Sequence, residues 1–439
     1  MKHFRKSLLS FFVIAMLFTS GIPANAEADD YTLKEVVVLS RHNIRSPLSG
    51  NGSILDLATK HEWFHWSSAA SELSLRGGIL ETEMGEYFRK WVVSEELMSE
   101  NYQPEKNEVR LYANAKQRTI ATANYFSAGF LPAANVPIEV NALYDTMDPV
   151  FNPQITAMNE EYRKAAEQEM LGMIPDDLSQ SYALLSDVID YSDSDGYKNG
   201  KLKDFANGDT EIMLEIGKEP GMTGSLKTAT SISDALVLQY YEEPDETAAA
   251  FGKNLTYDQW REIGGIKDLY TDVLFSAPSV SVQIANPLLQ VIDAELGRND
   301  RKFTFLCGHD SNIASVLASL GVRDYASENS IETKTPIGGK LVFEKWEDAN
   351  GSDYIKLRLV YQNKDQLRGM PLLTPDNPPS SLPLDIPGLT PNSDGLIPYE
   401  DFNRFLDEKV DAFDELKKKY GITDPTTSYV LQIPDTADR

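Results

Sequence analysis

The sequence predicts an α/β protein with an open, mostly parallel sheet, helices on both faces of that sheet, and a smaller helical cap domain. Three observations support this fold class. Short apolar runs of strand length end in polar or charged residues, and amphipathic segments of helix length separate them along the 439-residue chain. Between residues 137 and 235 the chain changes to long, acidic, amphipathic segments, which indicate the cap.

The first predicted strand lies in residues 35–47, EVVVLSRHNIRSP. Residues 36–39 form a continuous apolar run, which is typical of a strand buried on both faces. Arg41, His42 and Arg45 follow at its carboxyl end, where open α/β sheets bind ligands. Arginine presents a permanently charged fork of donors to phosphate oxygens, and a neutral imidazole can attack phosphorus. The pattern is therefore suited to phosphoryl transfer, with a solvated basic loop as the alternative.

Two further predicted strands strengthen this interpretation. Residues 302–309 form an apolar run that ends at His309 and Asp310, and residues 108–114 lead towards Arg118, a third guanidinium. His309 can donate a hydrogen bond to phosphate. Asp310 can protonate a leaving oxygen if partial burial raises its pKa.

The remaining elements place the helical cap between two parts of an α/β core. We expect the core to comprise residues 27–136 and 236–439, and the cap to comprise residues 137–235. The proline-rich residues 364–399 are expected to cross the surface before the last helix. Predicted helices span residues 75–91, 158–171, 178–189, 223–241 and 402–420, one more follows Ser311, and residues 340–346 and 354–361 form a hairpin.

At these motifs the chain resembles the histidine acid phosphatases, the second branch of the histidine phosphatase superfamily. That family has R-H-G-x-R-x-P near its N-terminus, which residues 41–47 match except at Asn43, and later R-T and H-D pairs, which match Arg118–Thr119 and His309–Asp310. Asparagine tolerates left-handed backbone angles, so we expect the turn to survive the change from glycine. The resemblance covers nearly the whole chain after residue 26 and implies a phosphoglycerate-mutase-like core.

The resemblance also implies roles for individual residues. His42 is expected to be the nucleophile and Asp310 the proton donor, while phosphate is held by the set Arg41, Arg45, Arg118 and His309. Within the family, the R-H-N sequence and several other segments are similar to bacterial periplasmic enzymes that act on glucose 1-phosphate. Glu219 matches a glutamate that contacts substrate in those enzymes; without the resemblance, an ordinary surface glutamate would be favoured.

The expected partner is therefore a small phosphate monoester, with no cofactor and no metal. Glucose 1-phosphate is the favoured substrate. The alternatives are inositol hexakisphosphate, the substrate of phytases in the same family, and the varied esters of a broad acid phosphatase. Glu219 would accept hydrogen bonds from sugar hydroxyls and repel substrates that carry several phosphates. A sugar-phosphate-binding protein without turnover is the non-enzymatic alternative. The sequence makes no prediction of the oligomeric state.

Residues 1–26 are predicted to be a secretory signal peptide. They combine a basic start, MKHFRK, an apolar run from residue 8 to residue 22, and the sequence ANA that ends at Ala26. A retained membrane anchor is the alternative, but the apolar run is short and is followed by glycine and proline. We expect a soluble mature protein in the periplasm or outside the cell, with no membrane association after cleavage.

Net charge and cysteine content narrow the function classes further. The formal charge is -26 at pH 7, and removal of residues 1–26 would make it about -29, so nucleic acid is not an expected partner. Positive charge must instead be concentrated locally at the phosphate site. Cys307 is the only cysteine, so no intramolecular disulfide can form, and it is expected to be a small buried apolar residue.

Two short motifs suggest metals and provide rival hypotheses. Residues 61–65 fit H-E-x-x-H, the zinc motif of metalloproteases, in which the two histidines share one face of a helix. Residues 190–196 resemble half of a calcium loop, but they place Tyr191 where the first ligand is needed. Trp63 and Trp66 are expected either to line the substrate entrance or to anchor their loop. A solvated acidic turn is the better interpretation of residues 190–196.

Overall fold

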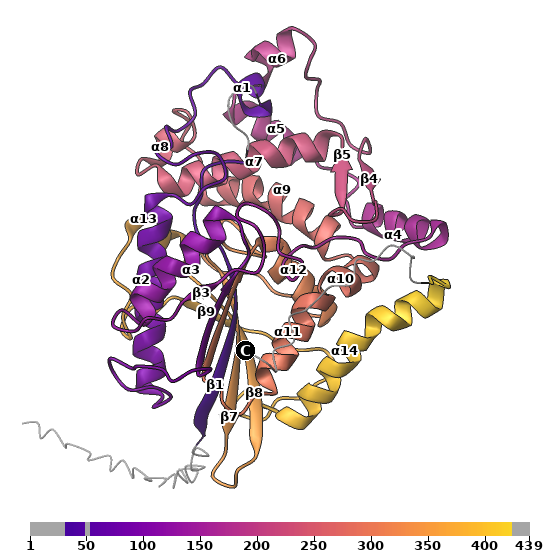
Figure 1. Cartoon of the computed structure of the whole chain (residues 1–439). Helices are drawn as coiled ribbons and strands as arrows, with labels where there is room; N and C mark the ends of the chain where they lie inside the picture. The colour runs from indigo at the N-terminus through magenta and orange to yellow at the C-terminus, as the bar shows by residue number, and fades with distance from the viewer. Residues whose placement is uncertain (1–30, 49–52, 424–439) are drawn as a thin grey trace, which may run out of the picture.

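The computed structural model describes residues 31–48 and 53–423, and it is built around one mixed sheet (Figure 1). The sheet has eight strands in the order β10-β8-β7-β1-β6-β2-β3, with β9 paired to β8. Its strands are β1 (Thr32–Arg41), β2 (Val109–Ala113), β3 (Ile138–Glu139), β6 (Phe303–Gly308), β7 (Lys340–Glu347), β8 (Asp353–Tyr361), β9 (Ser380–Pro383) and β10 (Ile397–Pro398).

The centre of the sheet confirms the α/β prediction. β1, β6, β2 and β3 run parallel to one another, and the predicted hairpin β7–β8 continues the sheet antiparallel to β1. Val36 and Val38 belong to the apolar cluster on one face, whereas Val37 and Leu39 belong to the cluster on the other. All four are fully buried, which explains why β1 is continuously apolar rather than alternating.

Helices cover both faces of this sheet (Figure 1). On one face lie α2 (Leu75–Ser94) and α3 (Gln117–Phe130), and on the other lie α11 (Asn286–Leu296), α12 (Asp310–Ser319) and α14 (Tyr399–Tyr420). Two glycines let α2 and α3 pack closely: a Cβ on Gly85 would lie 2.2 Å from the Phe126 carbonyl oxygen, and one on Gly129 would lie 2.0 Å from the Thr82 carbonyl oxygen. Cys307 is buried in the same layer, as expected.

A second, mainly helical part lies above the carboxyl ends of the parallel strands (Figure 1). Most of its buried apolar residues form a cluster separate from the two that flank the sheet. Its elements are α1 (Ile54–Ala58), α4 (Glu160–Gly172), α5 (Ser179–Val188), a 3₁₀ turn (Tyr191–Asp193), α6 (Asp195–Lys198), β4 (Glu211–Met213), β5 (Gly221–Thr223), α7 (Ser225–Glu242), α8 (Glu246–Ala249), α9 (Tyr257–Phe275), α10 (Pro278–Ile284) and α13 (Lys364–Gly369).

The helical part differs in two ways from the expected cap. It contains a two-stranded antiparallel sheet, β4–β5, that the sequence did not indicate. Its packing also continues past residue 235, because α7 crosses that position and packs against α9. The domain boundaries at residues 136/137 and 235/236 therefore remain a prediction.

The helices that were not predicted include α9, α10 and α11, and the proline-rich segment is more ordered than expected. A capping box at the start of α9 was a usable signal, because Thr256 and Gln259 cap each other's backbone there. Residues 364–399 do not only cross the surface: β9 and β10 within them each pair with β8. Proline is tolerated in these short strands because they lie at the edge of the sheet.

Candidate active site

The site is formed where β1 and β6 end side by side. The backbone N–H of His42 donates to the Gly308 carbonyl at 3.0 Å, which ties the turn after β1 to the end of β6. The N-terminus of α2 presses on the same turn, since a Cβ on Gly77 would lie 2.4 Å from the Ile44 carbonyl oxygen. The parallel strands thus bring His42 and the distant pair His309–Asp310 into one crevice, as predicted.

His42 has the protonation state that a nucleophile needs. It is 3% exposed, and its Nδ1 lies 2.9 Å from the Asn43 carbonyl oxygen. A carbonyl can only accept, so Nδ1 holds the proton and the Nε2 lone pair is free. Burial, and then the nearby charge of Arg118, lower the pKa of His42 well below its usual value, so the ring is neutral.

Asn43 supports this turn in a way that the sequence did not suggest. It does not adopt a left-handed backbone conformation. Its side-chain amide donates to Glu81 at 2.9 Å and its side-chain oxygen accepts from the Ile44 N–H at 2.9 Å. Glu81 in turn pairs with the buried Lys340 at 2.8 Å. The asparagine therefore anchors the turn to α2 and β7, where a glycine would leave Glu81 without this donor.

His309 is held in the same tautomer as His42, with its proton on Nδ1. Its Nε2 lies 2.6 Å from the side-chain nitrogen of Asn114, whose oxygen accepts from the Ala115 and Asp148 N–H groups. The Asn114 amide therefore donates to Nε2, which leaves the proton on Nδ1 available to a ligand. The rings of His42 and His309 lie 5.5 Å apart, edge to face.

The three predicted arginines each leave a hydrogen-bond donor free. Arg41 pairs with Glu332 at 2.6 Å and Arg45 pairs with Asp234 at 3.1 Å, while Arg118 has no carboxylate within ion-pair distance among the described residues. Within that same part of the chain, the buried Nε of every one of these arginines lacks a partner. Desolvation, and then the charge of Arg45, lower the pKa of Arg118 to about 10. An anion bound between Arg45 and Arg118 would relieve this repulsion.

Asp310 is a carboxylate that two nearby cations stabilise. It begins α12, and its Oδ1 accepts from the Ser311 N–H at 2.9 Å. Its Oδ2 lies 3.0 Å from Lys267 Nζ and 3.7 Å from Arg41 Nη2. Burial alone would raise the pKa, but these two cations outweigh it and hold the pKa of Asp310 well below its usual value. A pKa raised by burial, the condition stated for proton donation by Asp310, is thus not met in the substrate-free protein.

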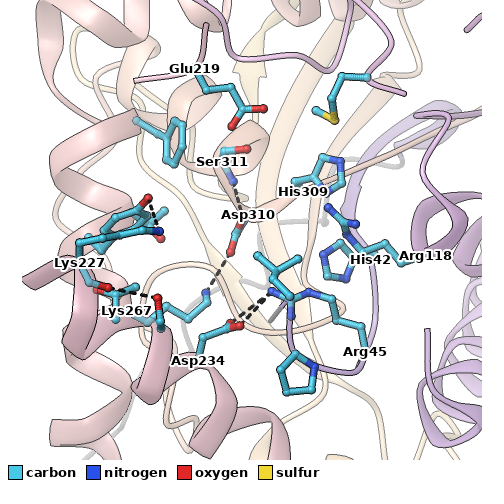
Figure 2. A pocket seen from close by; sticks show the side chains of 18 of the residues that line it. His42, Arg45, Arg118, Glu219, Lys227, Asp234, Lys267, His309, Asp310 and Ser311 are labelled. Atoms are coloured by element: carbon cyan, nitrogen blue, oxygen red, sulfur yellow. Dashed lines mark hydrogen bonds and ion pairs between the residues drawn. The ribbon is translucent and has the colours of Figure 1, made fainter. Parts of the chain in front are cut away.

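These side chains line a cavity of about 270 Å³, which is small for a ligand site. Figure 2 shows Arg45, Arg118 and both histidines on one side, Asp310 in the middle, and Lys227 and Lys267 opposite. Glu219 reaches the cavity from the segment before β5, as predicted, and is exposed to it. Desolvation by the surrounding atoms, and then the Asp310 carboxylate, raise the pKa of Glu219. Arg41 lies beneath the cavity.

Sequence reasoning missed the wall that α7 and α9 contribute. From α7, Lys227, Thr230, Ser231 and Asp234 face the cavity, and from α9 comes Lys267. Polar residues at this three- and four-residue spacing form a stripe along one face of an otherwise apolar helix, which was a usable signal in α7. Nothing comparable marked Lys267, because its helix was not predicted.

The two metal motifs do not have the geometry that they require. Residues 61–65 are not helical, so the two histidines of the zinc motif do not share a helix face; instead, His61 pairs with Asp190 at 2.8 Å. Asp190 also pairs with Lys253 at 3.0 Å. No group of three or more possible metal ligands occurs within residues 31–48 and 53–423. Trp63 donates to the Leu55 carbonyl at 3.2 Å and packs in the helical part, which supports an anchoring role.

The sequence as a whole matches the family that its motifs suggested. The family model of the histidine phosphatase superfamily (branch 2) matches residues 32–361, three quarters of the chain, including every predicted site residue. The chain belongs to this superfamily branch. It is therefore a histidine phosphatase, an enzyme that acts on phosphate monoesters.

Individual relatives are similar over almost their full length. A glucose-1-phosphatase of Salmonella typhimurium is 37% identical over 409 residues, which cover 92% of this chain and 98% of that protein. A glucose-1-phosphatase of Providencia rettgeri is 36% identical over 409 residues, with coverage of 91% and 98%. The solved structure of the Hafnia alvei phytase in its apo form superposes with a TM-score of 0.79 at 28% identity, over 87% of this chain and 98% of that chain.

Proposed function

We propose that this phosphatase hydrolyses glucose 1-phosphate to glucose and phosphate through a phosphohistidine at His42. One observation carries the proposal: a buried, neutral His42 with a free Nε2 lines a cavity together with Arg45 and Arg118, and Arg41 lies beneath it. Within the described part of the chain, the Nε of each of these three arginines lacks a partner. Such a site attracts a phosphate and attacks it. The choice of sugar phosphate is supported by the two related glucose-1-phosphatases.

The proposed reaction has two steps. His42 Nε2 attacks phosphorus in line with the leaving oxygen, while Arg41, Arg45, Arg118 and His309 hold the other phosphate oxygens. Asp310 gives a proton to the sugar oxygen as the P–O bond breaks. Water then attacks the phosphohistidine, Asp310 takes a proton from that water, and phosphate leaves.

Glu219 is proposed to select the leaving group. Its carboxylate faces the cavity from the side opposite the nucleophile turn, where the hydroxyls of a sugar can donate to it. A second phosphate at the same place would meet this carboxylate and be repelled. A phytase activity is the second candidate, favoured by the similarity to the Hafnia alvei phytase and by Lys227, a cation that lines the cavity from α7.

We also propose that the enzyme is exported and that residues 137–235 act as a cap. The predicted signal peptide, residues 1–26, lies outside the described residues. Among the described helices, none is long and apolar enough to cross a membrane. Export predicts a mature N-terminus at Glu27, which sequencing the N-terminus of the protein recovered from the periplasm or medium would detect.

Phosphate release by the mature protein at mildly acidic pH tests the function. We expect a higher kcat/KM for glucose 1-phosphate than for inositol hexakisphosphate, with no loss on adding a chelator. His42→Ala should remove turnover by a factor of at least about 10³ while leaving the melting temperature nearly unchanged. Substantial activity in this variant would contradict the assignment of the nucleophile, and a preference for inositol hexakisphosphate would favour the phytase.

A further inference from the structure

A lysine that the proposed reaction does not use lies against the proton donor. Lys267, in the middle of α9, is 4% exposed, and lysine is rarely this buried unless it is paired. Its Nζ is 3.0 Å from Asp310 Oδ2 and 3.2 Å from Glu332 Oε1. Figure 2 shows it reaching Asp310 from the side of the cavity opposite His42.

Lys267 is one link in a chain of four alternating charges. Glu332 is fully buried; its Oε1 accepts from both Lys267 and Arg41, and its Oε2 accepts from the Ile337 N–H at 3.0 Å. Along this chain the order is Arg41, Glu332, Lys267 and Asp310, and the two positive and two negative charges sum to zero. Asp310 is the most exposed member, since its side chain is 25% exposed against 5% or less for the others. A change in charge at the cavity therefore reaches this chain through Asp310.

We propose that Lys267 is a positioning residue that holds Asp310 as a carboxylate, turned towards the leaving group, until the phosphate ester binds. The proposal rests on the assignment of Asp310 as proton donor. Other titratable or polar groups also face Asp310. Arg41 and His42 do so from the end of β1, and Arg118 does so from α3. The Ser311 N–H and His309 lie at the start of α12, and Glu219 lies before β5. Among the charged groups of the described chain, Lys267 makes the shortest contact with Asp310.

This arrangement determines where the leaving-group proton comes from. Because Asp310 is ionised in the free enzyme, the proton has to arrive on the substrate, as the phosphate monoanion. An O–H bond on phosphate breaks and one forms on Asp310. That proton then passes to the sugar oxygen as the P–O bond breaks and the bond from His42 Nε2 to phosphorus forms. The alkaline limb of kcat/KM should thus follow the second pKa of the ester, roughly 6, and the acid limb should follow Asp310.

The test compares Lys267→Met with Lys267→Arg in pH profiles of kcat/KM and kcat. Without the ammonium the pKa of Asp310 rises, so the acid limb of kcat/KM in Lys267→Met should move up by about 1 to 3 pH units. Lys267→Arg keeps the charge, and its acid limb should stay near that of the wild type. With 4-nitrophenyl phosphate, whose leaving group needs little protonation, kcat should fall less than with glucose 1-phosphate.

Two results would overturn the inference. An acid limb of Lys267→Met that superimposes on the wild type would show that the lysine does not control Asp310. A higher KM with an unchanged acid limb would make Lys267 a phosphate ligand instead. If Lys267→Met does not fold, Lys267→Gln, which keeps an N–H donor without the charge, takes its place.

The source of the leaving-group proton can also be tested on the wild-type enzyme. A series of phosphate esters with different second pKa values should move the alkaline limb in step with the ester, and a limb that stays fixed would contradict the proposal. A failure of this inference is distinct from a failure of the proposed function, because the latter would appear as activity in His42→Ala.

Discussion

At the scale of single residues, the site is built from groups that are costly to keep without a ligand. Arg118 is the clearest case, because it is desolvated beside Arg45 and has no carboxylate within ion-pair distance among the described residues. A group in this position destabilises the empty protein and is retained for what it does when phosphate is bound. Arg118 thus lowers the stability of the ligand-free protein and strengthens the binding of phosphate.

Replacing Arg118 should separate these two effects. Arg118→Met keeps the length of the side chain and removes its charge, so the melting temperature of the ligand-free protein should be equal or higher. We expect kcat/KM to fall by about 10² to 10³ and the stabilisation by added phosphate to shrink. Calorimetry with and without phosphate, together with steady-state kinetics, checks both. A large loss of stability in the ligand-free variant would show that the arginine is structural.

Glu219 offers a second test at this scale, on selectivity rather than rate. Glu219→Gln keeps an oxygen that accepts hydrogen bonds and removes the charge, so the ratio of kcat/KM for inositol hexakisphosphate to that for glucose 1-phosphate should rise roughly tenfold. Glu215→Gln is a matched control, because Glu215 is exposed and pairs with Lys218 away from the cavity. An unchanged ratio in Glu219→Gln would remove the selectivity role.

At the scale of elements, the contact between α2 and the nucleophile turn limits how far that turn can move. In the first turn of the helix, Gly77 lies against the Ile44 backbone, and Asn43 connects the same nucleophile turn to Glu81 one helical turn further on. The nucleophile turn is therefore held to α2 through its backbone at Ile44 and through the side chain of Asn43. Both contacts act on the peptide whose carbonyl fixes the His42 tautomer.

Gly77→Ala should disturb this clamp. The new Cβ would lie 2.4 Å from the Ile44 carbonyl oxygen, a backbone atom that can move only with the turn. We expect a loss of stability of about 1 to 3 kcal/mol and at least a roughly tenfold loss of kcat. Gly265→Ala in α9 is the control, since a Cβ there meets nothing within 4 Å and should stabilise its helix slightly. Full activity in Gly77→Ala would mean that the turn tolerates the shift.

The elements that sequence could and could not predict differ in physical character. β1 was predictable because burial on both faces requires the continuous apolar run of residues 36–39, and its polar ending located the nucleophile. α9 was missed although its capping box was visible, and Lys267 was missed with it. The low pKa of Asp310 could not be predicted at all, because it depends on a lysine 43 residues earlier and an arginine 269 residues earlier in the chain.

At the scale of the whole molecule, the central strand connects two charged ends with different roles. Its carboxyl end carries the site. Near its other end, Glu35 is 2% exposed, and both of its carboxyl oxygens lack a hydrogen-bond partner in the described part of the chain. Six residues of strand, roughly 20 Å, separate it from Arg41. The two ends should therefore respond to mutation independently.

Glu35 should make the stability of the whole protein depend on pH. Burial raises the pKa of Glu35 from 4.5 to about 8, although the nearby Lys345 partly opposes this. Between these two values the folded protein keeps a proton that the unfolded chain has released, so the free energy of unfolding falls as the pH rises from 4.5 to about 8.

Glu35→Gln cannot ionise, so it should lose this slope. The variant should gain on the order of a few kcal/mol over the wild type at pH 8 and little at pH 4.5, with kcat at saturating substrate unchanged. Denaturant unfolding at both pH values measures the difference. If the two proteins show parallel stability curves across this range, Glu35 is ionised in the folded state and its buried carboxylate is stabilised by Lys345. In that case, removing the charge of Lys345 should destabilise the protein more at pH 8 than at pH 4.5.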